Sequence, residues 1–497
     1  MELSRIWPLF TTLLYLLNIA IAVYSSVMLI SSKRDPVKTL SWVLVMILLP
    51  YVGILLYFFF GRNFRKDKMF SRKGARDLGL RKELCREMLE KFEDRNNIPK
   101  EVRRCHKLVV QNIRSAHSLL SANHSVKIYF SGKEALSAML QDMRMARTHI
   151  HLQSFIIEDD KVGNEFKEVL IAKAREGLEV RMMFDGFGGR HLGRKFLKEL
   201  QDAGVEILNF SPFRLLFLPP IVNYRNHRKI LVVDGKVGFL GGVNIADRYY
   251  DGGEFPEWRD THVRIEGMSV MSLQATFLLD RYFILNKNLG RRRKYYPDVD
   301  FRDKEMLTAG KAGGDRYYAQ ILSSGPDSDW AGIMQCYFTA ITKARDHIFI
   351  ITPYFMPSET ILNAIKITAL SDVKVSIMIP ERSDTWLTNR GTMSYISELI
   401  DAGVKVYLFK RGFNHSKVLS IDGEYCIIGS ANMDNRSLEH HFEVTSVLYD
   451  AECARTVEER FRKDLSRCTL VSKAKWNRRP LRNKFYESVA RLVSPLL

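Results

Sequence analysis

Two short segments contain residue types that can carry out nucleophilic and acid–base catalysis. Both follow the pattern H-x-K-x4-D: His227, Lys229 and Asp234 in the first, and His415, Lys417 and Asp422 in the second. An imidazole with a pKa of about 6.5 can attack an electrophile or transfer a proton near neutral pH. A lysine ammonium beside it can stabilise negative charge as that charge builds up. The spacing therefore predicts one reaction that uses both segments.

The surroundings of the two segments repeat as well. Residues 226–235 match residues 414–423, and both segments continue to a Gly-x-x-Asn tetrapeptide that ends at Asn244 or Asn432. Residues 146–151 likewise match 344–349. A single histidine in a strand is usually structural, but two motifs in matching places indicate a duplicated domain with a shared function.

Each motif must be positioned by a β-hairpin, because an Asp-Gly pair separates two apolar runs. Side chains two apart on a strand share a face, so His227 lies beside Lys229 and His415 beside Lys417. Asp234 and Asp422 fall on the other parity, at the turn. Of the six motif residues predicted to form the catalytic set, the two aspartates therefore take a structural role, and the His/Lys pairs carry the chemistry.

Alternating strands and amphipathic helices before and after these hairpins predict an α/β fold. Two uncharged stretches precede them, Trp7–Ile30 and Thr39–Phe60, and each is long enough to cross a bilayer. A cleaved signal peptide is the alternative for the first stretch, but the second apolar stretch follows at once. We expect a transmembrane hairpin in residues 1–62 (spans about 7–30 and 39–60), a basic helical linker in 63–120, and two α/β halves in 121–310 and 311–497.

The charge of the chain is strongly positive, with 75 Lys and Arg against 56 Asp and Glu. Residues 62–114 hold 17 basic and 8 acidic side chains, and residues 455–491 hold 12 and 4. Such a surplus suits nucleic acid or an anionic membrane surface. Basic residues are more numerous outside the two spans than between them, which predicts cytoplasmic termini and a cytoplasmic catalytic part. The six cysteines show no metal-type spacing and are read as reduced thiols.

The duplicated motif makes the chain resemble the phospholipase D superfamily, whose signature is HxKxxxxD. Further segments are similar to bacterial cardiolipin synthases: residues 34–62, 258–260, 352–357 and 491–497. The resemblance implies two pseudo-twofold-related halves with mixed sheets and one shared active site. It also implies a membrane-bound phosphatidyltransferase that joins two phosphatidylglycerol molecules into cardiolipin and releases glycerol. No metal and no cofactor are expected, the partners are anionic phospholipids and the membrane, and nucleic acid is not expected.

The resemblance implies roles for individual residues. Lys229 and Lys417 would neutralise the phosphodiester oxygens, with Asn244 and Asn432 as additional donors. His227 is assigned as the nucleophile that forms a phosphohistidine, and His415 as the general acid and base. Asp260 and Glu443 lie at matching places after the two histidines, and we expect them to orient the imidazoles, within a half or across the seam.

Other features leave alternatives open. His149-x-His151 could pass for a metal pair but lacks a third ligand at suitable spacing. The apolar segment 213–221, which the second half lacks, could dip into the membrane interface or pack in the core. Leu481, Phe485, Val489, Leu492, Val493 and Leu496 share one face of a basic amphipathic C-terminal helix suited to an anionic surface. A nuclease, a phospholipase D-type hydrolase and a silent scaffold are the alternative functions, and no oligomeric state is indicated.

Overall fold

The computed structural model describes residues 3–31, 36–49, 52–53, 56–57, 75–210, 224–287, 293–297 and 317–494. The chain divides into one unit of residues 1–68 and 215–223 and another of residues 69–214 and 224–497. The first unit contains helices α1 (Leu3–Ser31) and α2 (Pro36–Leu48). Within α1, Phe10–Val27 is long and apolar enough to cross a bilayer. The expected second span at 39–60 lies only partly within the described residues, where α2 is a shorter apolar helix.

The second unit is built on one 15-stranded mixed sheet. Its first-half strands are β1 (Leu120–Tyr129), β2 (His149–Ser154), β3 (Glu179–Asp185), β4 (Glu206–Phe210), β5 (Ile230–Val233), β6 (Val237–Gly241) and β8 (His262–Gly267). Its second-half strands are β9 (Tyr317–Ser324), β10 (His347–Ile351), β12 (Lys374–Pro380), β13 (Lys405–Phe409), β15 (Val418–Ile421), β16 (Tyr425–Gly429), β18 (Glu443–Tyr449) and β19 (Cys468–Leu470). Two-stranded pairs join β7 (Trp258–Arg259) to β14 (Phe413–Asn414) and β11 (Phe355–Met356) to β17 (Met433–Asp434).

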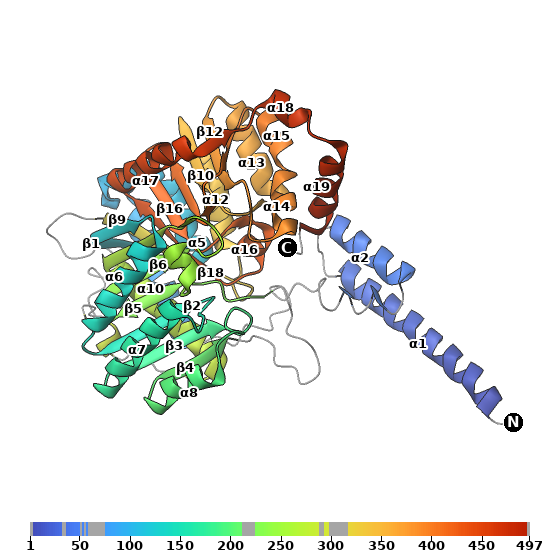
Figure 1. Ribbon diagram of the computed structural model, residues 1–497, viewed down its shortest axis with the longest axis horizontal. Coiled ribbons are helices and arrows are strands. Elements are labelled where there is room, and N and C mark those ends of the chain that lie inside the picture. The colour runs from blue at the N-terminus through green and yellow to red at the C-terminus, as the bar shows by residue number, and fades with distance from the viewer. Residues whose placement is uncertain are drawn as a thin grey trace. The chain divides into compact units, whose positions relative to one another are not determined.

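The strand order is the same in both halves when it is read outward from the centre. The first half runs β1-β8-β6-β5-β2-β3-β4, and the second runs β9-β18-β16-β15-β10-β12-β13 before β19 is added at its edge. The antiparallel pairing of β1 with β9 joins the two halves. Figure 1 shows the first half in cyan to green and the second in yellow to red. The predicted α/β fold with two mixed-sheet halves is thus confirmed.

Helices cover the sheet and alternate with its strands, as the periodicity predicted. The longer helices are α4 (Ala75–Glu93), α5 (His106–Ala116), α6 (Gly132–Arg144), α7 (Lys161–Arg175), α8 (Arg194–Asp202), α10 (Ser269–Leu285), α12 (Gly332–Lys343), α13 (Glu359–Leu370), α14 (Trp386–Met393), α17 (Ala451–Asp464) and α19 (Leu481–Val493). Short helices are α9 (Asp247–Asp251), α15 (Ile396–Asp401), α16 (Asn435–Glu439) and α18 (Lys473–Asn477), with 3-10 turns at Arg95–Asn97, Lys100–Cys105, Arg293–Tyr295 and Leu465–Arg467.

The hairpin strands are buried on both faces, which explains their unbroken apolar runs. In β5, Ile230 and Val232 join a core cluster shared by both halves, whereas Leu231 and Val233 join the core of the first half. The shared cluster also contains Ile428 and Val444 from the second half. The two halves therefore pack against each other through a common apolar core beside the histidine-containing segments.

Both hairpins turn where the sequence predicted. Asp234 and Gly235 have φ values of 56° and 67°, and Asp422 and Gly423 have 54° and 63°. Two successive positive φ values are typical of the type I′ turn, which matches the twist of the flanking strands. The His-x-Lys segments themselves lie just before β5 and β15 rather than inside them, because their backbones pair with other segments.

Candidate active site

Each histidine segment pairs with backbone from the opposite half of the protein. The His227 N–H donates to the carbonyl of Phe442 over 2.9 Å, and the His415 N–H donates to the carbonyl of Arg259 over 2.7 Å. The backbone N–H groups of the two histidines are therefore bonded across the seam and are not part of the central sheet. These contacts also carry the next residue of each partner segment, Glu443 or Asp260, to the imidazole.

The imidazoles are held by carboxylates across the seam. His227 Nδ1 lies 3.0 Å from Glu443 Oε1, and His415 Nδ1 lies 2.7 Å from Asp260 Oδ2. Both carboxylates are fully buried. At His227, the ionised Glu443 can only accept, so it favours the proton on Nδ1 and leaves Nε2 with a lone pair. Of the two arrangements left open by the sequence, the structure has the one in which each acid comes from the other half.

The two lysines bring buried positive charge to the same place. Lys229 donates to the carbonyl of His227 over 2.8 Å and lies over the Phe155 ring, while Lys417 donates to the carbonyl of His415. Lys417 Nζ also lies 2.7 Å from His415 Nδ1. Both lysines are at most 2 % exposed. A buried ammonium without an anionic ligand is costly, so this pair suits a substrate that brings its own negative charge.

Burial shifts the proton affinities of these groups. It lowers the pKa of His227 to about 4, against the opposing carboxylate of Glu443. It also lowers the pKa of His415 well below its usual value, and the positive charge of Lys417 adds to this effect. The pKa of Lys229 falls to about 7 and that of Lys417 to about 8, in both cases chiefly through burial. Burial therefore favours the neutral imidazole at His227, as a nucleophile requires.

The motif aspartates lie away from the imidazoles and fasten the sheet. The Asp234 carboxylate accepts backbone N–H groups from Arg147, Thr148 and His149 at 2.7–3.0 Å. Asp422 accepts the equivalent N–H groups of residues 345–347, each over 2.9 Å. Each aspartate therefore joins its hairpin turn to the start of a neighbouring strand, β2 or β10.

The two asparagines differ in their surroundings. Asn244 is buried, accepts the N–H of Ile156 and donates its amide to the Tyr249 hydroxyl over 2.5 Å. Asn432 is 6 % exposed, and its Oδ1 has no hydrogen-bond partner within the described part of the chain. Asn244 thus supports the loop beside the site, and its amide is directed at a protein hydroxyl.

The repeat also places residues near the imidazoles that the sequence did not single out. Strand pairing makes Trp258 and His441 equivalent, and their rings lie 5.4 Å from His415 and 5.9 Å from His227. Tyr354 lies 6.3 Å from the His415 ring and donates its hydroxyl to Asp384 over 2.6 Å. Trp258 and Tyr354 lie in segments marked by the resemblance. His441 could have been found by aligning the two halves through their acids.

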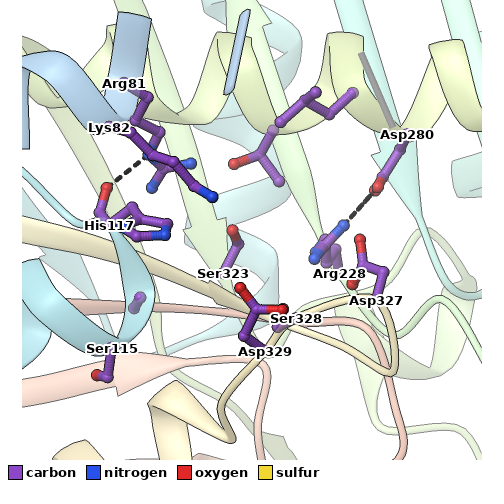
Figure 2. A pocket seen from close by; sticks show the side chains of 13 residues that line it. Arg81, Lys82, Ser115, His117, Arg228, Asp280, Ser323, Asp327, Ser328 and Asp329 are labelled. Atoms are coloured by element: carbon purple, nitrogen blue, oxygen red, sulfur yellow. Dashed lines mark hydrogen bonds and ion pairs between the residues drawn. The ribbon is translucent and has the colours of Figure 1, made fainter. Parts of the chain in front are cut away.

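Arg228 alternates to the opposite side of the strand from His227 and Lys229. Its guanidinium binds both oxygens of Asp280 at 2.5 and 2.6 Å and donates to the carbonyls of Glu443 and Ser324. Arg228 and Asp280 line a cavity of about 300 Å³ together with Arg81 and His117. Figure 2 shows these side chains. Neither catalytic-motif histidine lines this cavity, so Arg228 supports the active-site strand from behind.

Further buried polar residues around the site have structural roles. His149 Nε2 and His151 Nδ1 each lie 3.1 Å from Oε1 of the buried Gln274. Both histidines are therefore hydrogen-bonded core residues. The Asp185 carboxylate accepts the N–H groups of Phe187 and of Asn226, which fixes the residue preceding His227. The segment 213–221 lies outside the described residues.

Comparisons with protein-family models cover both motifs and the N-terminal segment. The family model described as "Cardiolipin synthase, PLD-like domain" matches residues 139–254 and 337–465, which contain both motifs. The model described as "Phospholipase D-nuclease N-terminal" matches residues 20–62.

Relatives of similar length share more than a third of their residues with this chain. A cardiolipin synthase of Alkalihalophilus pseudofirmus is 38 % identical over 96 % of this chain and 92 % of its own. One of Halalkalibacterium halodurans is also 38 % identical, with the same shares covered. In fold, the phosphatidylserine synthase of Haemophilus influenzae Rd KW20 superposes with a TM-score of 0.59, covering 80 % of this chain and 100 % of its own at 14 % identity.

Proposed function

The chain belongs to the cardiolipin synthase family, and from this membership and the site geometry we propose that it joins two phosphatidylglycerol molecules into cardiolipin and releases glycerol. It is a phosphatidyltransferase of the phospholipase D type. The observation that carries the proposal is the cross-seam arrangement of two His–Lys pairs, each with a buried carboxylate on Nδ1. Such a site can attack a phosphodiester from one side and protonate its leaving group on the other.

In the first step, His227 Nε2 attacks the phosphorus of one phosphatidylglycerol. The bond from phosphorus to the glycerol oxygen breaks, and His415 donates a proton to that oxygen. Lys229 and Lys417 stabilise the negative charge on the non-bridging oxygens as it increases. The products are glycerol and a phosphatidyl group bound to His227 Nε2.

In the second step, a hydroxyl of another phosphatidylglycerol takes the place of the glycerol. His415, now neutral, removes the hydroxyl proton as the oxygen attacks phosphorus. The bond to His227 breaks and its electron pair returns to Nε2. One cardiolipin has formed, and both histidines have regained their starting states.

The division of roles requires a protonated His415 in the substrate complex. Burial and the charges of Lys417 and Lys229 lower the pKa of His415, and the Asp384 carboxylate opposes them only in part. The negative charge of a bound phosphodiester would raise the proton affinity of His415, as a general acid requires. His227 is paired with Glu443, which fixes its tautomer for attack through Nε2.

The apolar helices of the first unit support a proposal for the location of the protein. We place α1 across the bacterial cell membrane and the segment from 39 to 60 as a second span, with both termini on the cytoplasmic side. The basic residues of the 62–114 segment would then lie at the anionic cytoplasmic leaflet. Substrate lipids are thus present at high local concentration.

The decisive test is incubation of the purified protein with phosphatidylglycerol vesicles, followed by lipid mass analysis and a glycerol assay. Cardiolipin and glycerol should appear in equal amounts. Acid quenching during turnover should trap a lipid-labelled protein, and His227→Ala should abolish the label. Phosphatidic acid as the only lipid product would instead identify a hydrolase, and cleavage of single-stranded DNA a nuclease.

A further inference from the structure

Helix α19 is attached to the protein by its polar side rather than by its apolar side. Glu487 and Ala490 are the residues that α19 buries, at 4 % and 0 % exposure. Arg479 binds Glu487 through two hydrogen bonds, of 2.6 and 3.0 Å, and lies over the Trp476 ring. Arg491 pairs with Glu398. These contacts fix the rotation of the helix about its axis.

The opposite side of α19 is an exposed apolar stripe. Leu481, Phe485, Val489 and Leu492 are 81 %, 65 %, 43 % and 82 % exposed. Their spacing of four, four and three residues places them on one helical face. A helix on a water-soluble surface normally turns such a face to the core, so this orientation points to an apolar partner outside the second unit. Of the other stripe residues predicted from the sequence, Val493 is half-buried and Leu496 lies outside the described residues.

Charge and aromatic residues around the stripe identify the kind of partner. At 100° per residue, Arg482 and Lys484 border the stripe on its two sides, and both are exposed. Between residues 473 and 494 the sequence has seven basic residues, including these two, and one acid, Glu487, which is buried. Trp386, 59 % exposed, lies against Tyr486 of α19 with ring centroids 5.9 Å apart. An apolar stripe with cationic borders and an exposed tryptophan fits the headgroup region of an anionic bilayer.

This surface is connected to the active site through a short series of contacts. Trp386 begins α14, two residues after Asp384. Asp384 accepts the Tyr354 hydroxyl, and Tyr354 lies beside His415. A lipid contact at α19 and Trp386 would therefore hold the His415 side of the site close to the bilayer surface.

We propose that α19 and Trp386 form a second membrane contact, with the apolar stripe inserted at the boundary between head groups and acyl chains of an anionic leaflet. The contact is independent of α1 and rests on the placement of these side chains. It does not depend on which lipid the enzyme uses. Its function is to orient the catalytic part toward its lipid substrates.

The insertion can be measured on the full chain in vesicles of phosphatidylcholine and phosphatidylglycerol. An environment-sensitive fluorophore is attached at Phe485→Cys and, as the matched control, at Lys195→Cys on α8, where the side chain is 91 % exposed. Cys468→Ser in both backgrounds removes the half-buried native thiol. We expect brominated lipid to quench the label at 485 and to leave the label at 195 unchanged. No quenching at 485 would overturn the proposal, as would an emission change that follows protein concentration, which indicates a second copy of the chain as the partner.

A kinetic test separates orientation from catalysis. Phe485→Ser with Leu492→Ser should lower the rate on vesicle lipid by about tenfold, because insertion strength follows buried apolar area. The rate on monomeric short-chain phosphatidylglycerol should stay unchanged. Equal rates for the wild type and the variant on vesicles would contradict the proposed orientation. If the wild type makes no cardiolipin at all, the proposed reaction fails, but the quenching result still decides the membrane contact.

Discussion

At the scale of single residues, the two buried carboxylates determine what the imidazoles can do. Glu443 lies 3.0 Å from His227 Nδ1 and Asp260 lies 2.7 Å from His415 Nδ1, and each acid belongs to the half that does not carry its histidine. Ser430 donates to Glu443, whereas the equivalent Gly242 leaves room for Asp260, since a Cβ there would lie 2.0 Å from its Oδ1. The two carboxylates therefore have different neighbours in the two halves.

Glu443→Gln tests the carboxylate without removing its shape. The amide carries no charge, so the contribution that raises the pKa of His227 is lost and that pKa should fall further. The tautomer is also held less firmly, and we expect kcat to fall by about 10²-fold or more. The measurement is the rate on phosphatidylglycerol with a thermal unfolding curve beside it. A folded variant with near-normal kcat would remove Glu443 from the mechanism.

The lysines predict an alkaline limit to activity. The pKa of Lys229 is lowered to about 7 in the free enzyme, so its positive charge is lost as the pH rises through that value. Neutral His227 is available above about pH 4. We therefore expect the loss of charge on Lys229 to contribute a decline of kcat/KM above about pH 7.

Lys229→Arg is the matched variant for this limit. Arginine stays charged throughout the range, so the alkaline decline should move toward pH 8, where Lys417 titrates. The absolute rate should fall because guanidinium geometry differs, but the profile is compared after normalisation. An alkaline limit that does not move would show that Lys229 does not set it.

At the scale of elements, the two hairpins are the units that the sequence predicted best. Their Asp-Gly turns, their apolar strands and the structural role of Asp234 and Asp422 follow from local pattern alone. The cross-seam pairing could not be predicted in the same way. A strand pattern does not say which half supplies the neighbour of His227, and no local signal marks His441 as a neighbour of that imidazole.

The turn glycines allow a matched comparison of stability. Gly423→Ala places a Cβ at a φ of 63° with its nearest neighbour 3.7 Å away, so backbone strain alone should cost about 1–2 kcal/mol. Gly235→Ala has a similar φ of 67°, but its Cβ would lie 2.4 Å from the Tyr295 carbonyl oxygen. Overpacking should raise its cost to about 2–5 kcal/mol. Thermal unfolding of both variants measures the difference, and equal shifts would contradict the contact at Tyr295.

At the scale of the whole molecule, the two halves are interdependent. They share the β1–β9 pairing, and a common apolar core lies between them. The buried ion pair of Arg259 with Asp464 also crosses the seam, over 2.7 Å. The sequence predicted the duplication and the single site, because matching motifs imply a pseudo-twofold. It did not predict how much core the halves hold in common, since a buried apolar strand does not show which elements cover its two faces.

Splitting the chain tests this interdependence. Residues 1–310 and 311–497 are expressed separately and together, and cardiolipin formation is measured in membranes that contain phosphatidylglycerol. Each fragment alone should be inactive and prone to aggregate, because it exposes the shared core and leaves one imidazole without its carboxylate. Co-expression should restore activity, since each fragment supplies the acid that the other lacks. Co-expression with Glu443→Gln in the second fragment is the control and should lower the recovered rate as it does in the intact chain. Activity from either fragment alone would show that one His–Lys pair suffices and that the seam is not the catalytic centre.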